Sequence, residues 1–366
     1  MSKAAELAKW GEVSTNGQVS GRRNIVINGA MNVAQRSASV TDIGAAQGYF
    51  CTDRFKSTLV ATAARYTVSQ DTDAPAGFSK ALKYDVTTAD TSVAAGELHA
   101  ISYRAEGQDI SHFEWGTSDA EQCTFSFYAK ATSAQTVVVN FVRSTSGTSR
   151  SVSKAFSITT SYQRFTFTLP TDTGGSAQVE TNAEGLAIHI GFGAGSTYAG
   201  GTINETWEDI TNNKRFAGVG NLASSTDNNF FITGVQMEVG SVATPFEHRS
   251  FGEELALCQR YFQKSYQTGV TLGTVTAEGE IRYIGNSGYG EAAPVVQFKT
   301  TMRVSPTKTF YSPTSGTSGK ARNHSTAADV THSASNTSSD TSYSGSNYGA
   351  PDGNVMGYQY ALDSEL

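Results

Sequence analysis

The chain has 366 residues, of which 38% are hydrophobic and 16% are charged, and its formal net charge is −6. This length leaves room for two or more domains, each with its own core. The net negative charge argues against a nucleic-acid-binding protein, because contacts with phosphate groups need a stripe of basic residues. Basic runs in this sequence, such as Arg22 with Arg23, are too short to form one.

The chain starts with a predicted short helix, 2–10, in which Ser2 is the cap and Leu7 and Trp10 form an apolar edge. About nine residues make a marginal helix in isolation, so we expect it to be ordered by a partner. A polar, turn-rich stretch follows it. Residues 1–23 are therefore predicted to be a helix and arm that attach the chain to another protein.

From Asn24 onward the apolar residues alternate with a period of two, which is typical of strands that bury one face of a sheet. Turn residues separate these runs and no helical pattern interrupts them. We therefore predict a β-sandwich or a β-barrel over 24–249. The clearest runs are Phe125–Ala129, Val137–Phe141, Phe165–Leu169, Leu186–Phe192 and Phe231–Val239.

One strong helical pattern follows, at 250–266. Ser250 and Glu253 form a capping box, and Phe251, Leu255 and Cys258 begin an apolar stripe at helical spacing. The stripe fits packing on a neighbouring sheet or on copies of itself around a symmetry axis. We expect a linking helix between two β regions.

The remaining residues, 267–366, are predicted to form a small distal β domain. Short β-like runs come first, and 312–350 is rich in Ser, Thr, Gly and Asn. Tyr343, Tyr358 and Tyr360 suggest closing strands. We expect long polar loops on this domain, an arrangement often used for surface recognition.

The sequence contains no recognisable catalytic arrangement. No two acidic residues have a spacing that suggests a glycosidase pair, no GxSxG motif is present, and the six histidines are separated in the sequence. His189 is expected on a solvated strand position. His324, Asp329 and His332 could approach one another around a metal, but their flanks lack order signals, so no metal, cofactor or enzymatic activity is predicted.

Three cysteines, Cys51, Cys123 and Cys258, are widely spaced and include no CxxC pair, so neither a disulfide framework nor a zinc site is expected. No apolar run is long enough for a membrane span, and no signal-peptide core follows Met1. We expect synthesis in a cytoplasm and no membrane insertion.

Aromatic residues in polar surroundings are the candidates for ligand binding, because sugars stack on exposed rings. Trp115, Tyr198 and Trp207 have such surroundings and are predicted to bind a ligand. The alternative is that they plug the edge of the sandwich or a subunit interface.

Three segments resemble tail-fibre-like proteins of environmental phages. They are "RNIVINGAMNVAQR" at Arg23–Arg36, "CTDRF" at Cys51–Phe55 and the long run Phe230–Phe262. "FSFYAKA" and "SYQRFTFTL" are similar to inner strands of a jelly roll of the carbohydrate-binding-module type, and "VVQFKTTMRVSPTKTFYS" resembles the strand after the helix in the phage proteins. Phe55 stands where these proteins usually have Trp, so no stacking role is carried over to it.

The resemblance implies an all-β chain with a jelly-roll sandwich, a linking helix and a distal β domain, assembled as a homotrimer. It implies a virion protein of a bacteriophage, a tail-fibre or spike subunit that attaches to other tail or capsid proteins through 1–23. We expect such a subunit to recognise host-surface polysaccharide with many weak contacts. The alternatives are an architectural decoration fibre or adaptor without a receptor and, less favoured, a glycan depolymerase.

Overall fold

The computed structural model describes residues 22–285, 294–332, 334–345 and 353–366, and these form two compact units. In the described part, the first unit comprises 22–32, 39–50 and 55–249, and the second comprises Val33–Ala38, Cys51–Arg54 and Ser250–Leu366. The expected N-terminal helix lies outside the described residues. No helix in the described part combines the length and apolar character that a membrane crossing requires.

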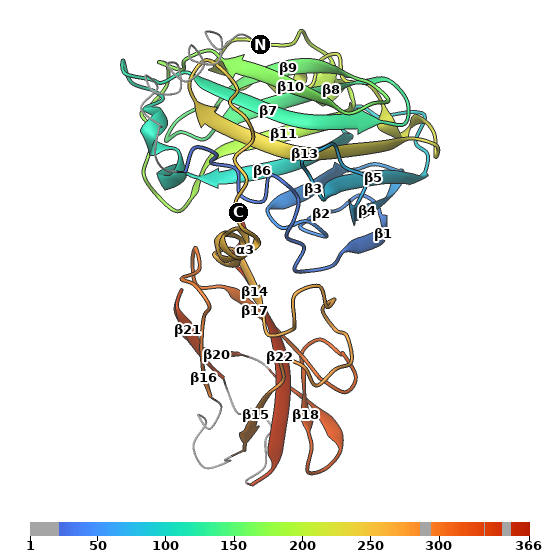
Figure 1. Cartoon of the computed structure of the whole chain (residues 1–366), viewed down its shortest axis with the longest axis vertical. Helices are drawn as coiled ribbons and strands as arrows, with labels where there is room; N and C mark the ends of the chain where they lie inside the picture. The colour runs from blue at the N-terminus through green and yellow to red at the C-terminus, as the bar shows by residue number, and fades with distance from the viewer. Residues whose placement is uncertain (1–21, 286–293, 333, 346–352) are drawn as a thin grey trace. The chain divides into compact units, whose positions relative to one another are not determined.

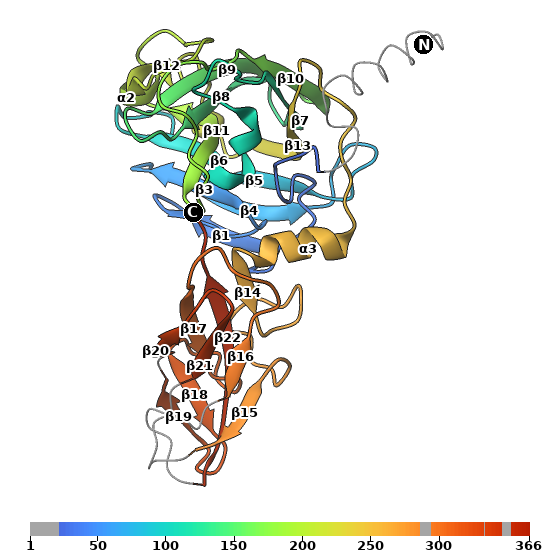
Figure 2. The same cartoon turned by 90° about the vertical axis from the view of Figure 1, so that its left-hand side faces the viewer.

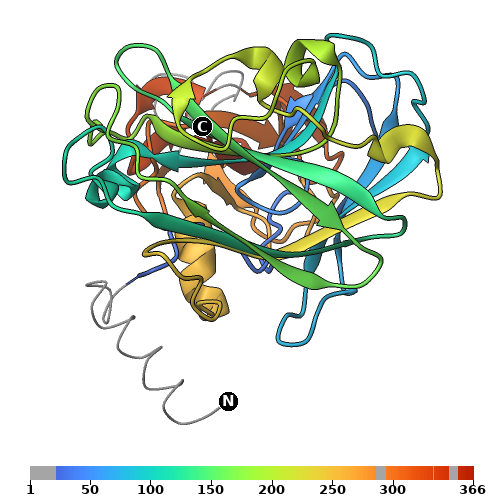
Figure 3. The same cartoon turned by 90° about the horizontal axis from the view of Figure 1, so that it is seen from above.

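The first unit is a sandwich of two antiparallel sheets (Figures 1 and 3). One sheet has six strands in the order β1-β4-β5-β13-β7-β10, and the other has seven in the order β12-β9-β8-β11-β6-β3-β2. The strands are β1 (Ser39–Ile43), β2 (Gln47–Gly48), β3 (Phe55–Val60), β4 (Arg65–Asp71), β5 (Ala81–Thr88), β6 (Leu98–Glu106), β7 (Cys123–Ala131), β8 (Gln135–Arg143), β9 (Arg150–Ile158), β10 (Gln163–Leu169), β11 (Glu184–Ala194), β12 (Glu208–Asp209) and β13 (Asn229–Val239).

Aromatic rings on alternate strand positions fill the space between the two sheets. Phe125 on β7 meets Phe141 on β8 with ring centroids 5.1 Å apart, and Phe127 meets Phe156 on β9 at 5.3 Å. Each pair joins one sheet to the other. The two-residue alternation thus produces the inner faces it predicted, and the expected all-β sandwich is confirmed.

The outer face of the seven-stranded sheet is partly covered by the chain that follows β11. Phe216 packs on Leu98, Ala100 and Val138, in a segment that contains the short helix α2 (Ser196–Ala199; Figure 2). The expectation that His189 is solvated is wrong. Its side chain is buried on this face and its Nδ1 lies 2.7 Å from Ser102 Oγ. The alternation correctly places His189 on the outer face of the sheet. The pattern of one strand does not show that a later segment of the chain covers this face.

The second unit is built around one long strand, β22 (Val355–Asp363). β14, β15, β17 and β18 all pair with it in antiparallel register, and β16, β21 and β20 form a separate three-stranded sheet (Figure 2). The bounds are β14 (Phe262–Lys264), β15 (Ile281–Ile284), β16 (Val295–Gln297), β17 (Thr307–Tyr311), β18 (Lys320–Asn323), β19 (Ala328–Thr331), β20 (Ala334–Ser338) and β21 (Ser342–Gly345). The Ser/Thr-rich region therefore contains hairpins where long loops were expected.

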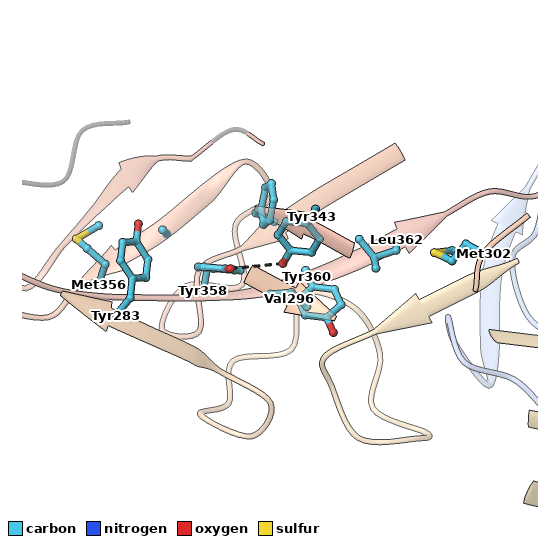
Figure 4. Close-up of a cluster of buried hydrophobic side chains, with 10 residues drawn as sticks. Tyr283, Val296, Met302, Tyr343, Met356, Tyr358, Tyr360 and Leu362 are labelled. Carbon is cyan, nitrogen blue, oxygen red and sulfur yellow. Dashed lines mark hydrogen bonds between the residues drawn. The ribbon is translucent and has the colours of Figure 1, made fainter. Parts of the chain in front are cut away.

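Tyrosines form much of the core of this unit. The hydroxyls of Tyr343 and Tyr358 lie 3.4 Å apart. Figure 4 shows this pair, with Tyr283 on one side of the cluster and Leu362 on the other. A tyrosine buries a large ring and still satisfies its polar tip when the hydroxyls pair. This packing explains how a domain with few aliphatic residues closes, and the expected closing strand at Tyr358 and Tyr360 is β22.

The linking helix is shorter than the predicted 250–266. α3 spans Phe251–Gln259, and Ser250 Oγ accepts a hydrogen bond from the Glu253 amide at 3.3 Å, as the capping box predicts. After Gln259 the chain turns, and Phe262–Lys264 pairs with β22 as strand β14. The apolar spacing at Phe262 fits a helix and a strand equally well, and the ladder with β22 selects the strand.

Two short N-terminal segments complete the second unit through a buried ionic cluster. Asp53 accepts hydrogen bonds from the amide of Gln35 at 2.9 Å and from Gln35 Nε2, which also donates to the Phe262 carbonyl at 2.9 Å. Arg54 pairs with Glu365, and its guanidinium lies 3.3 Å from the centroid of the Tyr261 ring. Gln35, Asp53 and Phe262 each belong to one of the three segments that resemble phage proteins, so these segments meet in the ionic cluster.

Candidate functional site

The second unit contains a pocket of about 260 Å³. It lies where the chain before and within β15, the turn after β17 and the end of the β18 strand meet. Both polar and apolar side chains line it, and it is open to solvent on one side. The lining residues are Val275, Thr276, Ala277, Glu280, Arg282, Pro313, Thr314 and His324.

Glu280 forms the polar floor of the pocket. Its side chain is only 3% exposed, and its Oε1 lies 2.6 Å from Nε2 of His324. Its Oε2 accepts a hydrogen bond from Nε of Arg282 at 2.8 Å, while the Arg282 side chain is 58% exposed. One buried carboxylate therefore fixes a histidine and an arginine at the pocket.

Gly357 on β22 makes room for this arrangement. A Cβ at this position would lie 1.8 Å from Glu280 Oε1 and 2.8 Å from His324 Nε2. Either distance is too short for a non-bonded contact, so any larger residue would push the two side chains apart. The backbone of β22 and the carboxylate–imidazole pair thus pack directly against each other.

The rim of the pocket is held by hydrogen bonds from neighbouring turns. The Thr276 amide donates to the Pro313 carbonyl at 3.1 Å, and Gln359 Nε2 donates to the Thr276 carbonyl at 3.0 Å. Asp329 accepts from the hydroxyls of Ser312 and Ser315 at 2.9 and 2.5 Å. A site whose walls are fixed in this way loses little conformational entropy when a ligand binds.

The electrostatics of Asp329 favour the charged carboxylate that ties the rim. Burial by itself raises the pKa of Asp329, but the hydrogen bonds from Ser315, Ser312 and Arg322 outweigh burial and lower it below the ordinary value. The carboxylate therefore stays ionised and keeps the 312–315 turn in place at neutral pH.

The pocket offers the groups that a polyhydroxylated ligand needs. Arg282 and the hydroxyls of Thr276 and Thr314 can donate hydrogen bonds, Glu280 and the hydroxyls can accept them, and Val275 and Pro313 provide apolar surface. A small number of fixed polar groups beside apolar surface is typical of small-molecule and sugar sites.

The structure does not support Trp115 and Trp207 as ligand-binding residues. Trp115 is completely buried and Trp207 is 8% exposed, and their rings meet with centroids 5.1 Å apart. Their indole Nε1 atoms donate to the carbonyls of Glu121 and Pro170 at 3.0 and 2.9 Å. They plug the edge of the sandwich, which was the alternative interpretation. Polar neighbours in sequence did not reveal this because the loops fold back over the rings.

Tyr198 is half-buried on α2, where it packs against the cluster around Phe216. It lies in the first unit, whereas the pocket belongs to the second. Tyr198 is not among the residues that line the pocket.

The possible metal group His324, Asp329 and His332 does not form in the structure. His324 pairs with Glu280, Asp329 holds the 312–315 turn, and His332 is buried against Tyr358 with ring centroids 4.8 Å apart. Sequence reasoning missed Glu280 and Arg282 as site residues. The residues next to Glu280 and Arg282 in the sequence form no motif. His324, the partner of Glu280, lies 44 positions later in the chain.

No protein-family model matches the chain, and no curated protein sequence matches it. Among solved structures, the enzymatically active domain of tailspike protein 4 of bacteriophage CBA120 matches 59% of this chain and 21% of its own chain, at 10% identity and a TM-score of 0.31. A structure described as CBM4 matches 58% of this chain and 97% of its own, at 12% identity and a TM-score of 0.31. A family 11 carbohydrate-binding module of Clostridium thermocellum matches 58% and 99%, at 8% identity and a TM-score of 0.29. The chain thus spans about a fifth of the tailspike chain.

Proposed function

We propose that this chain is a non-enzymatic structural subunit of a bacteriophage virion, a tail fibre or spike, and that the pocket of its second unit binds a glycan of the host surface. The observation that carries the proposal is the Glu280–His324–Arg282 group at the floor of a preformed pocket. Fixed donors and acceptors of this kind suit sugar hydroxyls, and shallow sites of this size give weak single contacts. Several subunits acting together would convert weak contacts into firm attachment.

Two features favour binding over hydrolysis. A glycosidase needs two carboxyl groups flanking the sugar bond, about 5 to 10 Å apart. Glu280 is the one carboxylate among the residues that line the pocket, and both of its oxygens are engaged by His324 and Arg282. This arrangement suits the positioning of a ligand, and the lining residues offer no second carboxyl group for a glycosidase pair.

Assembly as a homotrimer, anchored to tail or capsid proteins by residues 1–23, is part of the proposal. It is supported by exposed apolar side chains on the second unit. Ile284 and Val355 are 65% and 37% exposed and are direct partners across the β15–β22 ladder. Apolar side chains at the rim of a sheet are a liability for a monomer and suit an interface between sister chains.

Binding of the purified full chain to host cells and to their surface polysaccharide tests the proposal. We expect the wild type to bind the polysaccharide saturably. Glu280→Ala should bind it with at least about tenfold lower affinity, because the substitution removes a charged hydrogen-bonding group. Glu278→Ala is the matched control, since Glu278 is exposed two positions away and does not line the pocket.

Three other outcomes would contradict the proposal in distinct ways. Incorporation into particles with no binding to cells or polysaccharide would favour the architectural alternative. A decrease in polymer size during incubation would identify a depolymerase. Equal binding by wild type and Glu280→Ala would place the glycan site elsewhere on the chain.

A further inference from the structure

A second cluster of chemically reactive side chains lies in the first unit, at the arch that joins β5 of one sheet to β6 of the other. Asp90 follows β5, Glu97 precedes β6, and His99 is the second residue of β6. The three residues are 7%, 5% and 0% exposed. One ligand atom from each lies within 4.8 Å of the others.

Each member of this cluster is held in place by its surroundings. Asp90 Oδ2 accepts hydrogen bonds from Thr62 Oγ1 at 3.3 Å and from the Ala63 amide at 3.1 Å. His99 Nδ1 lies 2.8 Å from the hydroxyl of Tyr66 on β4. The Gly195 amide donates to the Glu97 carbonyl at 2.9 Å, which fixes the backbone at the start of β6.

Two polar atoms in the cluster have no hydrogen-bond partner although they are buried. They are Oε2 of Glu97 and Nε2 of His99, which lie 3.5 Å apart as a carboxylate–imidazole pair without hydrogen-bond geometry. A buried polar atom without a partner is uncommon and costly, so each such atom asks for an explanation. Here both residues belong to a group in which one ligand atom each of Asp90, Glu97 and His99 lies within 4.8 Å of the others.

The charges of the cluster are also unbalanced. Among the described residues, no lysine or arginine forms an ion pair with Asp90 or Glu97. A cation held by the two carboxyl groups and the imidazole nitrogen would supply the counter-charge.

We propose that Asp90, Glu97 and His99 bind one divalent transition-metal ion, with Zn²⁺ as the preferred ion. Nitrogen from a neutral imidazole and oxygen from carboxylates are ligands of Zn²⁺, whereas Ca²⁺ requires six to eight oxygens. Ligand atoms on one tetrahedral zinc ion are about 3.4 Å apart, so atoms that are now up to 4.8 Å apart would have to approach each other by up to about 1.4 Å.

The surroundings of His99 fit this role. A hydrogen bond at Nδ1 fixes the ring and leaves Nε2 available as the ligand, which is the common outer-shell arrangement of metal-bound histidines. Gly193 lies against the same ring, and a Cβ there would be 2.9 Å from Nδ1. The proposed ion would join the two sheets of the sandwich through the β5–β6 arch and would act on stability.

The test uses the full chain after treatment with a chelator, to which Zn²⁺, Mn²⁺ or Ca²⁺ is added separately. We expect one equivalent of Zn²⁺ to bind and to raise the melting temperature of the first unit, with weaker effects of Mn²⁺ and Ca²⁺. Asp90→Asn, Glu97→Gln and His99→Gln should each weaken Zn²⁺ binding by at least about tenfold. His112→Gln, an exposed histidine of the same unit, is the control that should retain binding.

A second measurement keeps the proposal testable if a variant fails to fold. Co²⁺ added to the chelator-treated wild type should give the visible absorption of a four-coordinate site, and added Zn²⁺ should displace Co²⁺ and remove that absorption. The proposal is overturned if Zn²⁺ leaves the melting temperature unchanged, if Ca²⁺ binds more tightly than Zn²⁺, or if the three variants bind Zn²⁺ like the wild type.

Discussion

Glu365→Gln should destabilise the second unit strongly, because it removes a carboxylate from the buried ionic cluster. Arg54 has a fully buried side chain, and Glu365 is 5% exposed and is its ion-pair partner. Glu365 also pairs with Arg36, whose side chain is 10% exposed, at 3.4 Å. Removing one partner of a buried ion pair costs about 3–5 kcal/mol, because a buried charge is left without its counter-charge.

A surface ion pair of the same chain gives the matched control. Lys154 and Glu205 are 3.0 Å apart, with side chains 33% and 51% exposed. Water and salt screen such a pair, so Glu205→Gln should change the free energy of unfolding by less than about 1 kcal/mol. The two variants make the same chemical change in a buried and an exposed setting.

Two signals separate the two units in this experiment. Trp115 and Trp207 lie in the first unit, so in a Trp10→Phe background the tryptophan fluorescence follows its unfolding, whereas calorimetry records the heat of both units. Glu365→Gln should lower the calorimetric transition of the second unit and leave the midpoint of the tryptophan signal in place. A change as small as that of Glu205→Gln would refute the claim that the ionic cluster holds the second unit together.

Three further predictions concern the core, acid sensitivity and the rejected binding residues. Phe127→Ala should lower the free energy of unfolding of the first unit by about 3–5 kcal/mol in urea titrations, because it leaves a cavity in the core between the two sheets. Burial lowers the pKa of His332 from 6.5 to about 4, so the unfolded chain binds more protons between these values and the second unit should lose up to about 3 kcal/mol as the pH falls through this range. His332→Phe should flatten this pH dependence in calorimetry, and an unchanged pH profile would contradict the assignment. Trp115→Phe should lower the melting temperature and leave glycan affinity unchanged, and a weaker affinity would restore Trp115 as a binding residue.

The sequence was informative where one physical pattern dominates. Side-chain alternation identified the sandwich, because strands that bury one face must repeat with a period of two. The capping box at Ser250 identified the start of α3. The end of that helix was missed because Phe262 satisfies helical spacing and also occupies a strand that pairs with β22, and the pairing partner lies about a hundred residues later.

The site was beyond reach of sequence reasoning for a similar reason. Glu280 and His324 meet because β15 and β18 both pair with β22, and Gly357 on that strand leaves room for them. None of these residues has a distinctive local neighbourhood. The buried tryptophans show the converse error, since a polar sequence context does not indicate exposure when the chain folds over the ring.

The most direct test of the glycan-binding claim compares wild type and Gly357→Ala for affinity toward an oligosaccharide released from the host surface polysaccharide, measured by calorimetric titration. The added methyl group should displace the Glu280–His324 pair and reduce affinity by at least about tenfold, while the melting temperature of the first unit stays the same. Equal affinities for the two proteins would contradict the claim that this pocket is the receptor site.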